Sequence, residues 1–330
     1  MPLILRKEDS MKEILNIKNL KIYFASSKGP IKSLNGVDLT LKEGQTLGLV
    51  GESGCGKSLT SLAIMGLLDK KSLDSLEGEI IFSGENLLEK SEKQIEKIRG
   101  KDISMIFQEP MTSLNPVLKI GYQVSEIYRA HSNISRKEAK EKSIEMLEKV
   151  ELNNAKLIYD SYPHELSGGM RQRVMIAMAL APNPKILIAD EPTTALDVTI
   201  QKEILELMKK LKKYYKTSLI FISHDLSLVA EIADVVNVMY QGLIVEEAPV
   251  KEIFKNPLHP YTKGLMRARP LISDTRKRLF SIKGSLQDPR YLNENCYFCN
   301  RCQYVMDICK RKIPIQKDFN GHKVRCFLYE

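Results

Sequence analysis

Residues 51–58, GESGCGKS, have the glycine, lysine and serine spacing of a loop that binds phosphate. The glycines let backbone N–H groups converge on phosphate oxygens, and a helix start after them adds the positive end of its dipole. Lys57 is placed to reach the β and γ phosphates of ATP, and the Ser58 hydroxyl to ligate Mg²⁺. The nucleotide contacts expected in this loop are Gly51, Glu52, Ser53, Gly54, Cys55, Gly56, Lys57, Ser58 and Leu59.

The adjacent carboxylates Asp190 and Glu191 could supply the remaining chemistry of ATP hydrolysis. They end the segment ILIADE at residues 186–191. A Mg·ATP site needs an acid to hold the metal and a polar group to orient the attacking water, so we assign Asp190 to Mg²⁺ and Glu191 as the base. An acidic pair alone is typical of a solvated turn. The apolar strand before it and the phosphate loop elsewhere make this pair specific.

Three short apolar runs must position these residues, and each ends in polar side chains. They are TLGLV at 46–50, KILIAD at 185–190 and SLIFISHD at 218–225. The repetition predicts a mainly parallel sheet with its ligand site outside the carboxyl ends of the strands. The phosphate loop lies between the first run and the helical segment SLTSLAIMGLL, which argues against an ordinary glycine-rich turn.

Other periodic segments flank this sheet. Apolar residues nearly alternate over 15–24 and over 37–41, which predicts half-buried antiparallel strands. A polar segment carries Ile144, Leu147 and Val150 on one helical face. The expected organisation is an ATPase core at 12–109 and 166–242, a helical subdomain at 110–165, and a C-terminal extension at 243–330 whose cysteine-rich module begins near 290.

Composition limits the class of protein. The 330 residues carry 43% hydrophobic and 28% charged side chains, and no run approaches the roughly 18 apolar residues of a spanning helix. Residues 1–10 lack the pattern of an export signal, so the cytosol is the default location. The net charge of +9 suits a polyanionic partner, although a lysine-rich surface also arises simply for solubility.

The cysteines are unevenly placed along the chain. Cys55 stands alone, and we interpret it as a bystander in a loop that works through its backbone. The other five crowd the last 35 residues, and in a reducing compartment such a cluster indicates metal more than disulfides. These five are Cys296, Cys299, Cys302, Cys309 and Cys326.

A second glycine-rich turn, LSGGMRQR at 166–173, opens an apolar helix with Ser167 placed to cap it. Together with the phosphate loop, Gln108 in MIFQEP, TTALD at 193–197 and His224 in FISHD, it resembles the ATP-binding cassette family in motif order and spacing. The resemblance implies an α/β P-loop NTPase fold, with a mixed sheet core, an antiparallel β subdomain and a helical subdomain.

The resemblance also implies roles for further residues. Two cassettes pack head to tail, so that the glycine-rich turn of one closes on the nucleotide of the other. Gln108 senses and helps to ligate Mg²⁺, His224 contacts the γ-phosphate, and Phe24 stacks on adenine, with Tyr23 as the alternative. Leu59 replaces the usual second hydroxyl, so any α-phosphate contact there comes from backbone N–H. The contacts made in trans are Ser167, Gly168, Gly169 and Asp197.

The resemblance narrows to the ATPase subunits of oligopeptide and dipeptide importers. It rests on QEPMTSLNP, ELSGGMRQRV, DEPTTALDVTIQ and NPLHPYTKGL, and it covers residues from about 12 to 330. It implies ATP-driven peptide import, or import of nickel complexes as in some relatives. The chain would lie peripherally on the cytoplasmic face of the cell membrane. Its partners would be a homologous second ATPase, two permease subunits and, indirectly, an extracellular substrate-binding protein.

A nucleic-acid-associated cassette ATPase is the competing class. Only about 59 positions separate Gln108 from Ser167, too few for the long coiled coil of chromosome-maintenance cassettes. Translation-factor cassettes are normally tandem, and this chain carries one copy of its motifs. We therefore expect no nucleic-acid partner.

For the tail, the importer family typically has a pattern that NCYFCNRC, Cys309, Pro314 and Cys326 fit, with Cys299 as an extra cysteine. This resemblance selects four ligands and implies a [4Fe–4S] cluster, whose thiolates can be widely spaced. Zn²⁺ is the alternative, although structural zinc sites usually show tight CxxC pairs. Four buried reduced thiols are a third possibility, and His322 could replace one cysteine. The selected ligands are Cys296, Cys302, Cys309 and Cys326.

Overall fold

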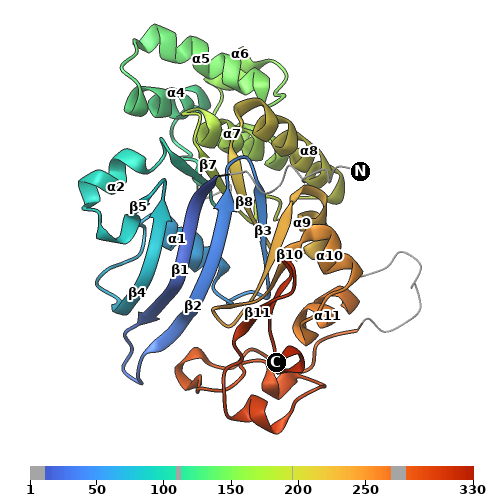
Figure 1. Cartoon of the computed structure of the whole chain (residues 1–330). Helices are drawn as coiled ribbons and strands as arrows, with labels where there is room; N and C mark the ends of the chain where they lie inside the picture. Colours follow the sequence, from blue (N-terminus) through green and yellow to red (C-terminus); the bar gives the residue numbers. More distant parts are fainter. Residues whose placement is uncertain (1–11, 109–112, 195, 269–279) are drawn as a thin grey trace, which may run out of the picture.

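The computed structural model describes residues 12–108, 113–194, 196–268 and 280–330. An eight-stranded sheet runs through the centre of the molecule in the order β11-β12-β10-β9-β3-β8-β7-β6 (Figure 1). The five strands from β9 to β6 are parallel, and β10, β12 and β11 continue the sheet in antiparallel pairs. The strands are β3 (Thr46–Val50), β6 (Ile103–Ile106), β7 (Ile186–Asp190), β8 (Ser218–Ser223), β9 (Val235–Tyr240), β10 (Leu243–Pro249), β11 (Gln316–Asp318) and β12 (Lys323–Arg325).

A separate four-stranded antiparallel sheet lies beside the central one, in the order β2-β1-β4-β5. Its alternating residues Leu15, Ile17, Leu20 and Ile22 are buried, as the periodicity predicts. The three-residue step from Ile17 to Leu20 coincides with a register shift, so the bulge keeps both side chains on the buried face. The strands are β1 (Glu13–Phe24), β2 (Ile31–Lys42), β4 (Leu73–Phe82) and β5 (Glu85–Asn86).

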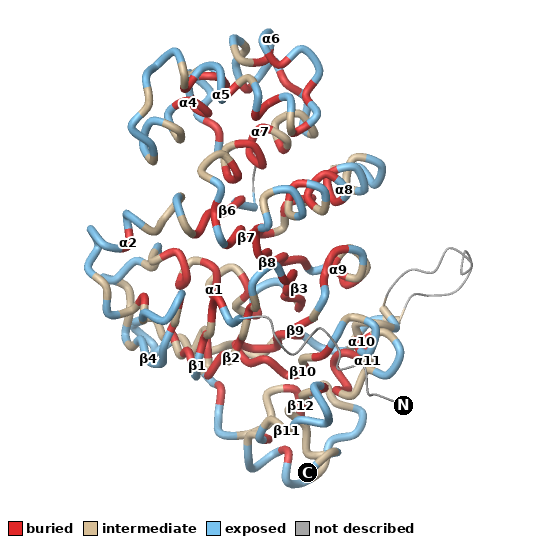
Figure 2. The backbone as a smooth tube through the Cα atoms, turned by 45° about the horizontal axis from the view of Figure 1, so that its top comes forward, coloured by how far each residue is buried: buried red, intermediate tan, exposed pale blue. Residues whose placement is uncertain are grey.

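Helices cover the faces of the central sheet, whose strands are largely buried (Figure 2). Close packing requires Gly48 in the middle of β3, because a Cβ there would lie 2.2 Å from Cγ1 of Val229 on α9. The helices of this part are α1 (Lys57–Ile64), α2 (Glu92–Ile98), α7 (Gly168–Leu180), α8 (Val198–Tyr215) and α9 (Leu226–Ile232), with the short 3-10 turn η1 (Leu87–Glu89).

The helical segment forms the end of the molecule opposite the C-terminal extension (Figure 1). Leu147 and Val150 are fully buried and Ile144 is half-buried against the same core, so the predicted apolar face exists. Residues 109–112, where this segment was expected to begin, lie outside the described part of the chain. Its helices are α4 (Ile120–His131), α5 (Arg136–Lys149) and α6 (Ala155–Asp160), and the turn η2 (Pro163–Glu165) follows.

The C-terminal extension is joined to the core through the central sheet. β12 pairs with β10, and β10 pairs with β9 across the boundary expected at Gly242. Within the described ranges, no helix is long and apolar enough to cross a bilayer. The elements of the extension are α10 (Val250–Lys255), α11 (Pro260–Arg267), η3 (Pro289–Tyr291), η4 (Cys299–Arg301), η5 (Asp307–Lys310) and η6 (Phe327–Tyr329).

A buried carboxylate fastens the last strands to the core. Glu246 on β10 is fully buried, and His322 lies 2.7 Å from it through Nε2. The backbone N–H groups of Leu258 and His259 donate to the same carboxylate. Because Nε2 of His322 is paired with Glu246, only Nδ1 of this histidine would be left to replace a cysteine ligand.

Candidate nucleotide site

The phosphate loop connects β3 to α1 and encloses a pocket with a volume of about 260 Å³. Two glycines are required by close contacts. A Cβ at Gly51 would lie 2.3 Å from the Met239 carbonyl oxygen. A Cβ at Gly56 would lie 2.5 Å from the Leu34 side chain, and Gly56 has a φ of +110°, which favours glycine. The pocket is lined by Ser33, Ser53, Gly54, Gly56, Lys57, Ser58, Leu59, Gln108 and Glu191.

The loop's own groups hold Lys57 in place. Its ammonium donates to the carbonyl oxygens of Gly51 at 2.8 Å and Glu52 at 3.1 Å, and the residue is buried. Cys55 is also buried, and burial raises the pKa of its thiol, which disfavours the reactive thiolate form. This agrees with the interpretation of Cys55 as a bystander.

Asp190, at the end of β7, has the surroundings of a cation ligand. It is buried, and one carboxylate oxygen, Oδ1, has no hydrogen-bond partner among the described residues. Burial raises the pKa of this carboxyl, while the hydroxyl of Ser58, which donates to it, opposes the rise. A divalent cation would satisfy the unpaired oxygen, so Asp190 and Ser58 fit a Mg²⁺ site.

The structure brings Glu191 together with two of the other predicted residues. Its carboxylate oxygen Oε2 accepts from Gln108 Nε2 at 3.3 Å and from Thr194 Oγ1 at 2.9 Å, and His224 Nδ1 lies 3.3 Å away. The Glu191 side chain is 12% exposed, whereas that of His224 is 60% exposed. Glu191 has a φ of +47° and its N–H donates to Ile222 O, which fixes the turn after β7.

Sequence reasoning missed Ser33, which lines this pocket, and Thr194, which donates to Glu191. Thr194 stands in the TTALD motif, so its place three residues after Glu191 could have indicated it. Ser33 lies on β2 and no motif marks it. Ala195 of the same motif lies outside the described residues.

The residues expected to act in trans do not line this pocket. Ser167 is exposed and caps α7, accepting from Met170 N at 3.3 Å. Asp197 is exposed and caps α8 in the same way, accepting from Ile200 N at 3.0 Å. Gly168 and Gly169 form the first turn of α7. Phe24 ends β1 and pairs with Ile31, outside the residues that line the pocket.

The tail cysteines are all free thiols. Burial and the neighbouring cysteines raise the pKa of Cys296 to about 12, and the same causes raise the pKa of Cys326 to about 11. The N–H of Cys296 donates to the carbonyl of Cys309, and Tyr304 N–H donates to the Cys302 sulfur. Across residues 12–108, 113–194, 196–268 and 280–330, no group of three or more His, Cys, Asp or Glu side chains is arranged to hold a metal ion.

The central sheet, the phosphate loop, the acidic pair after β7 and the capped glycine-rich start of α7 together define an ATP-binding cassette NTPase. Residues 34–194 match the family model described as ABC transporter, and residues 245–309 match the one described as Oligopeptide/dipeptide transporter, C-terminal region. The chain belongs to the ATP-binding cassette family and, within it, to the oligopeptide and dipeptide transport group.

Individual relatives agree over the full length. The oligopeptide transport ATP-binding protein AppD of Bacillus subtilis is 50% identical, over 97% of this chain and 98% of that one. OppD of the same organism is 48% identical, over 96% and 88%. Among solved structures, the post-hydrolysis dimer of the ATP-binding cassette MJ0796 with ADP and Pi gives a TM-score of 0.64 at 29% identity, covering 72% of this chain and 98% of that one.

Proposed function

We propose that this chain is the ATP-hydrolysing subunit that powers import of di- or oligopeptides through a membrane permease. The observation that carries the proposal is that Glu191 and Gln108 line one pocket with the phosphate loop, while His224 lies 3.3 Å from the Glu191 carboxylate. The coupling to transport is inferred from the family, because the names of the relatives concern oligopeptide transport or peptide import. The chain would lie peripherally on the cytoplasmic face of the cell membrane.

In the proposed mechanism, Glu191 takes a proton from the water that attacks the γ-phosphate. Thr194 and Gln108 donate to its carboxylate and so fix its direction. His224 reaches the same carboxylate from an exposed position, where it can contact the γ-phosphate. Lys57 leaves its carbonyl partners for the β and γ phosphates, and Phe24 stacks on adenine.

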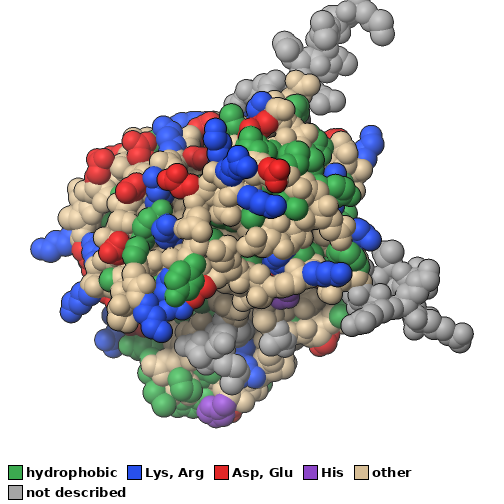
Figure 3. Space-filling model, turned by 90° about the horizontal axis from the view of Figure 1, so that it is seen from below, with side chains coloured by type: hydrophobic (Ala, Val, Ile, Leu, Met, Phe, Trp, Pro, Cys, Tyr) green, Lys and Arg blue, Asp and Glu red, His purple; other side chains and the backbone are tan. Residues whose placement is uncertain are grey.

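Asp190, Ser58 and Gln108 would hold Mg²⁺, which supplies charge neutralisation on the phosphate oxygens when bound. Ser167, Gly168, Gly169 and Asp197 would complete the nucleotide site of a second ATPase, which we propose is a homologous subunit. Two permease subunits and an extracellular substrate-binding protein would form the rest of the transporter. On the face in Figure 3, basic side chains are interspersed with acidic ones, which gives no support to a nucleic-acid partner.

Transport by the assembled complex tests the proposal. Vesicles that contain the permease, both ATPases and the substrate-binding protein are expected to accumulate a labelled tripeptide only when ATP is supplied on the ATPase side. A labelled nickel chelate serves as the competing cargo. ATP-driven uptake of the chelate without uptake of any peptide would contradict the peptide assignment and leave the ATPase assignment in place.

We also propose that Cys296, Cys302, Cys309 and Cys326 hold a [4Fe–4S] cluster that folds the tail, with Zn²⁺ as the alternative. The described side chains are not arranged as a ligand set, and the support is chemical: burial and then the neighbouring thiols raise the pKa of Cys296 and Cys326, so a bound cation would stabilise their thiolate forms. The tail also has little regular structure of its own, only 3-10 turns and two three-residue strands from residue 289 onward. When bound, the cluster would supply cross-links between these turns.

Replacing Cys302 with serine is expected to remove most of the iron from anaerobically prepared protein, because one of four thiolates is lost. Cys299→Ser is the matched control, because Cys299 begins the 3-10 turn that Cys302 follows, and this variant should keep about four irons per chain. ATP hydrolysis should stay measurable in the Cys302 variant. Parent protein that contains zinc and no iron would overturn the cluster, and loss of iron in both variants would overturn the choice of ligands.

A further inference from the structure

Arg301, between Cys299 and Cys302 in the tail, reaches into the phosphate loop. Its two terminal nitrogens donate to the two carboxylate oxygens of Glu52 at 2.8 and 3.0 Å, a fork that a lysine could not form. The Arg301 side chain is 6% exposed and that of Glu52 is 28% exposed, so water screens this pair only weakly. The sequence separation is 249 residues.

The C-terminal extension also holds the backbone of Glu52. Its N–H donates to the hydroxyl of Tyr261 at 2.9 Å, and Tyr261 on α11 is fully buried. Phe298, next to Cys299, packs against Tyr261 and Tyr240 with ring centroids 5.5 and 5.2 Å apart. The tail therefore supports the floor of the phosphate loop through an aromatic cluster as well as an ion pair.

This support bears on the group that must move when nucleotide binds. Lys57 rests on the carbonyl oxygens of Gly51 and Glu52, so the orientation of the Glu52 peptide sets where its ammonium lies. We propose that Arg301 is a positioning residue for the phosphate loop, through which the cysteine-rich tail sets the affinity of the chain for ATP. The inference rests on the proposed ATP site and adds a control over it from outside the cassette core.

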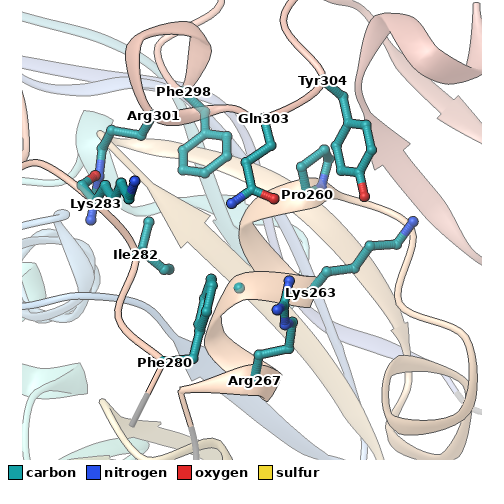
Figure 4. Close-up of a pocket in the computed structure, with 11 residues that line it drawn as sticks. Pro260, Lys263, Arg267, Phe280, Ile282, Lys283, Phe298, Arg301, Gln303 and Tyr304 are labelled. Atoms are coloured by element: carbon teal, nitrogen blue, oxygen red, sulfur yellow. The ribbon is translucent and has the colours of Figure 1, made fainter. Parts of the chain in front are cut away.

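The pocket beside Arg301, away from Glu52, offers this residue no ligand site. Figure 4 shows Arg301 with Phe298 on the cysteine-rich ribbon, above a pocket that Phe280 and Arg267 close from below. The volume of this pocket is about 80 Å³, well short of the roughly 300 Å³ at which ligand pockets begin. Arg301 uses its remaining nitrogen, Nε, to donate to the Lys283 carbonyl. One terminal nitrogen also donates to the Tyr240 hydroxyl at 3.4 Å, so the guanidinium is committed to Glu52, Tyr240 and Lys283.

Equilibrium titration of the full chain with a fluorescent ATP analogue tests the inference. Arg301→Ala is expected to raise the Kd about tenfold, because an unpaired Glu52 carboxylate lets the loop leave its binding conformation. Hydrolysis at saturating ATP should fall by less than about twofold, so the effect appears in KM and not in kcat. The double variant Glu52→Gln/Arg301→Ala should bind more tightly than Arg301→Ala, since it carries no unpaired carboxylate.

Arg290→Ala is the matched control. Arg290 also donates to both carboxylate oxygens of a neighbour, Asp288, but the two residues belong to one short turn of the tail. Loss of this pair should leave the Kd unchanged.

A Kd within twofold of the parent in a folded Arg301→Ala protein would overturn the inference. So would a double variant that binds the analogue more weakly than both single variants. If Arg301→Ala does not fold, Arg301→Lys and Glu52→Gln carry the test, and an unchanged Kd in both overturns it. Failure of the parent to bind the analogue would instead contradict the ATP site itself.

Discussion

Glu191→Gln is expected to lower the rate of ATP hydrolysis by about 100-fold or more, because removal of a positioned general base typically costs that much. The amide keeps the size of the side chain and can still accept from Thr194 and Gln108, but it cannot take a proton from water. Glutamine also keeps the backbone constraint at a φ of +47°, so a rate loss would not reflect relief or addition of strain. Phosphate release by the assembled complex measures the effect.

Binding of ATP should survive the same substitution. The side chain faces the pocket from the end of β7, whereas the phosphate contacts come from the loop before α1. The Kd for a fluorescent ATP analogue is therefore expected to stay within about threefold of the parent. Glu203→Gln is the matched control: this carboxylate on α8 is exposed and pairs with Arg173, and its loss should change neither rate nor affinity. Turnover within threefold of the parent in Glu191→Gln would remove Glu191 from the role of base.

The elements that carry this site could be predicted because their signals are local. The run TLGLV coincides with β3, and the polar ends of the other two runs mark the ends of β7 and β8. Parallel strands bring their carboxyl ends to one edge, so residues 108, 191 and 224 meet although they are far apart in the chain. The hydrophobic pattern predicted the parallel strands and placed the ligand site outside their ends, whereas the roles of Gln108 and His224 came from the resemblance to the ATP-binding cassette family.

The attachment of the tail could not be predicted in this way. Arg301 and Glu52 are ordinary charged residues, and nothing in either neighbourhood indicates a partner 249 residues away. His322 shows the same limit: beside five cysteines it suggests a metal ligand, yet its partner is the buried Glu246 on β10. Such pairs depend on how β12 docks against β10, a long-range contact that hydrophobic periodicity does not encode.

Ser167→Asp is expected to lower turnover of the assembled transporter by more than about 100-fold, because a carboxylate would face the γ-phosphate held by the partner ATPase, and like charges in contact cost several kcal/mol. Aspartate caps a helix as well as serine does, so α7 should keep its start. Binding of an ATP analogue to the isolated chain should be unchanged, since Ser167 does not line the pocket of its own chain.

The control for this substitution is another serine that caps a helix. Ser135 accepts from Glu138 N at the start of α5, so Ser135→Asp tests the same chemical change in the helical segment, away from the pocket. It should alter neither turnover nor affinity. If Ser167→Asp weakened nucleotide binding to the isolated chain as much as it slowed turnover, the glycine-rich turn would act on its own chain's nucleotide. Unchanged turnover would mean that the turn meets no nucleotide at all. The predicted combination, turnover lost and binding kept, is the one that requires a site shared between two subunits.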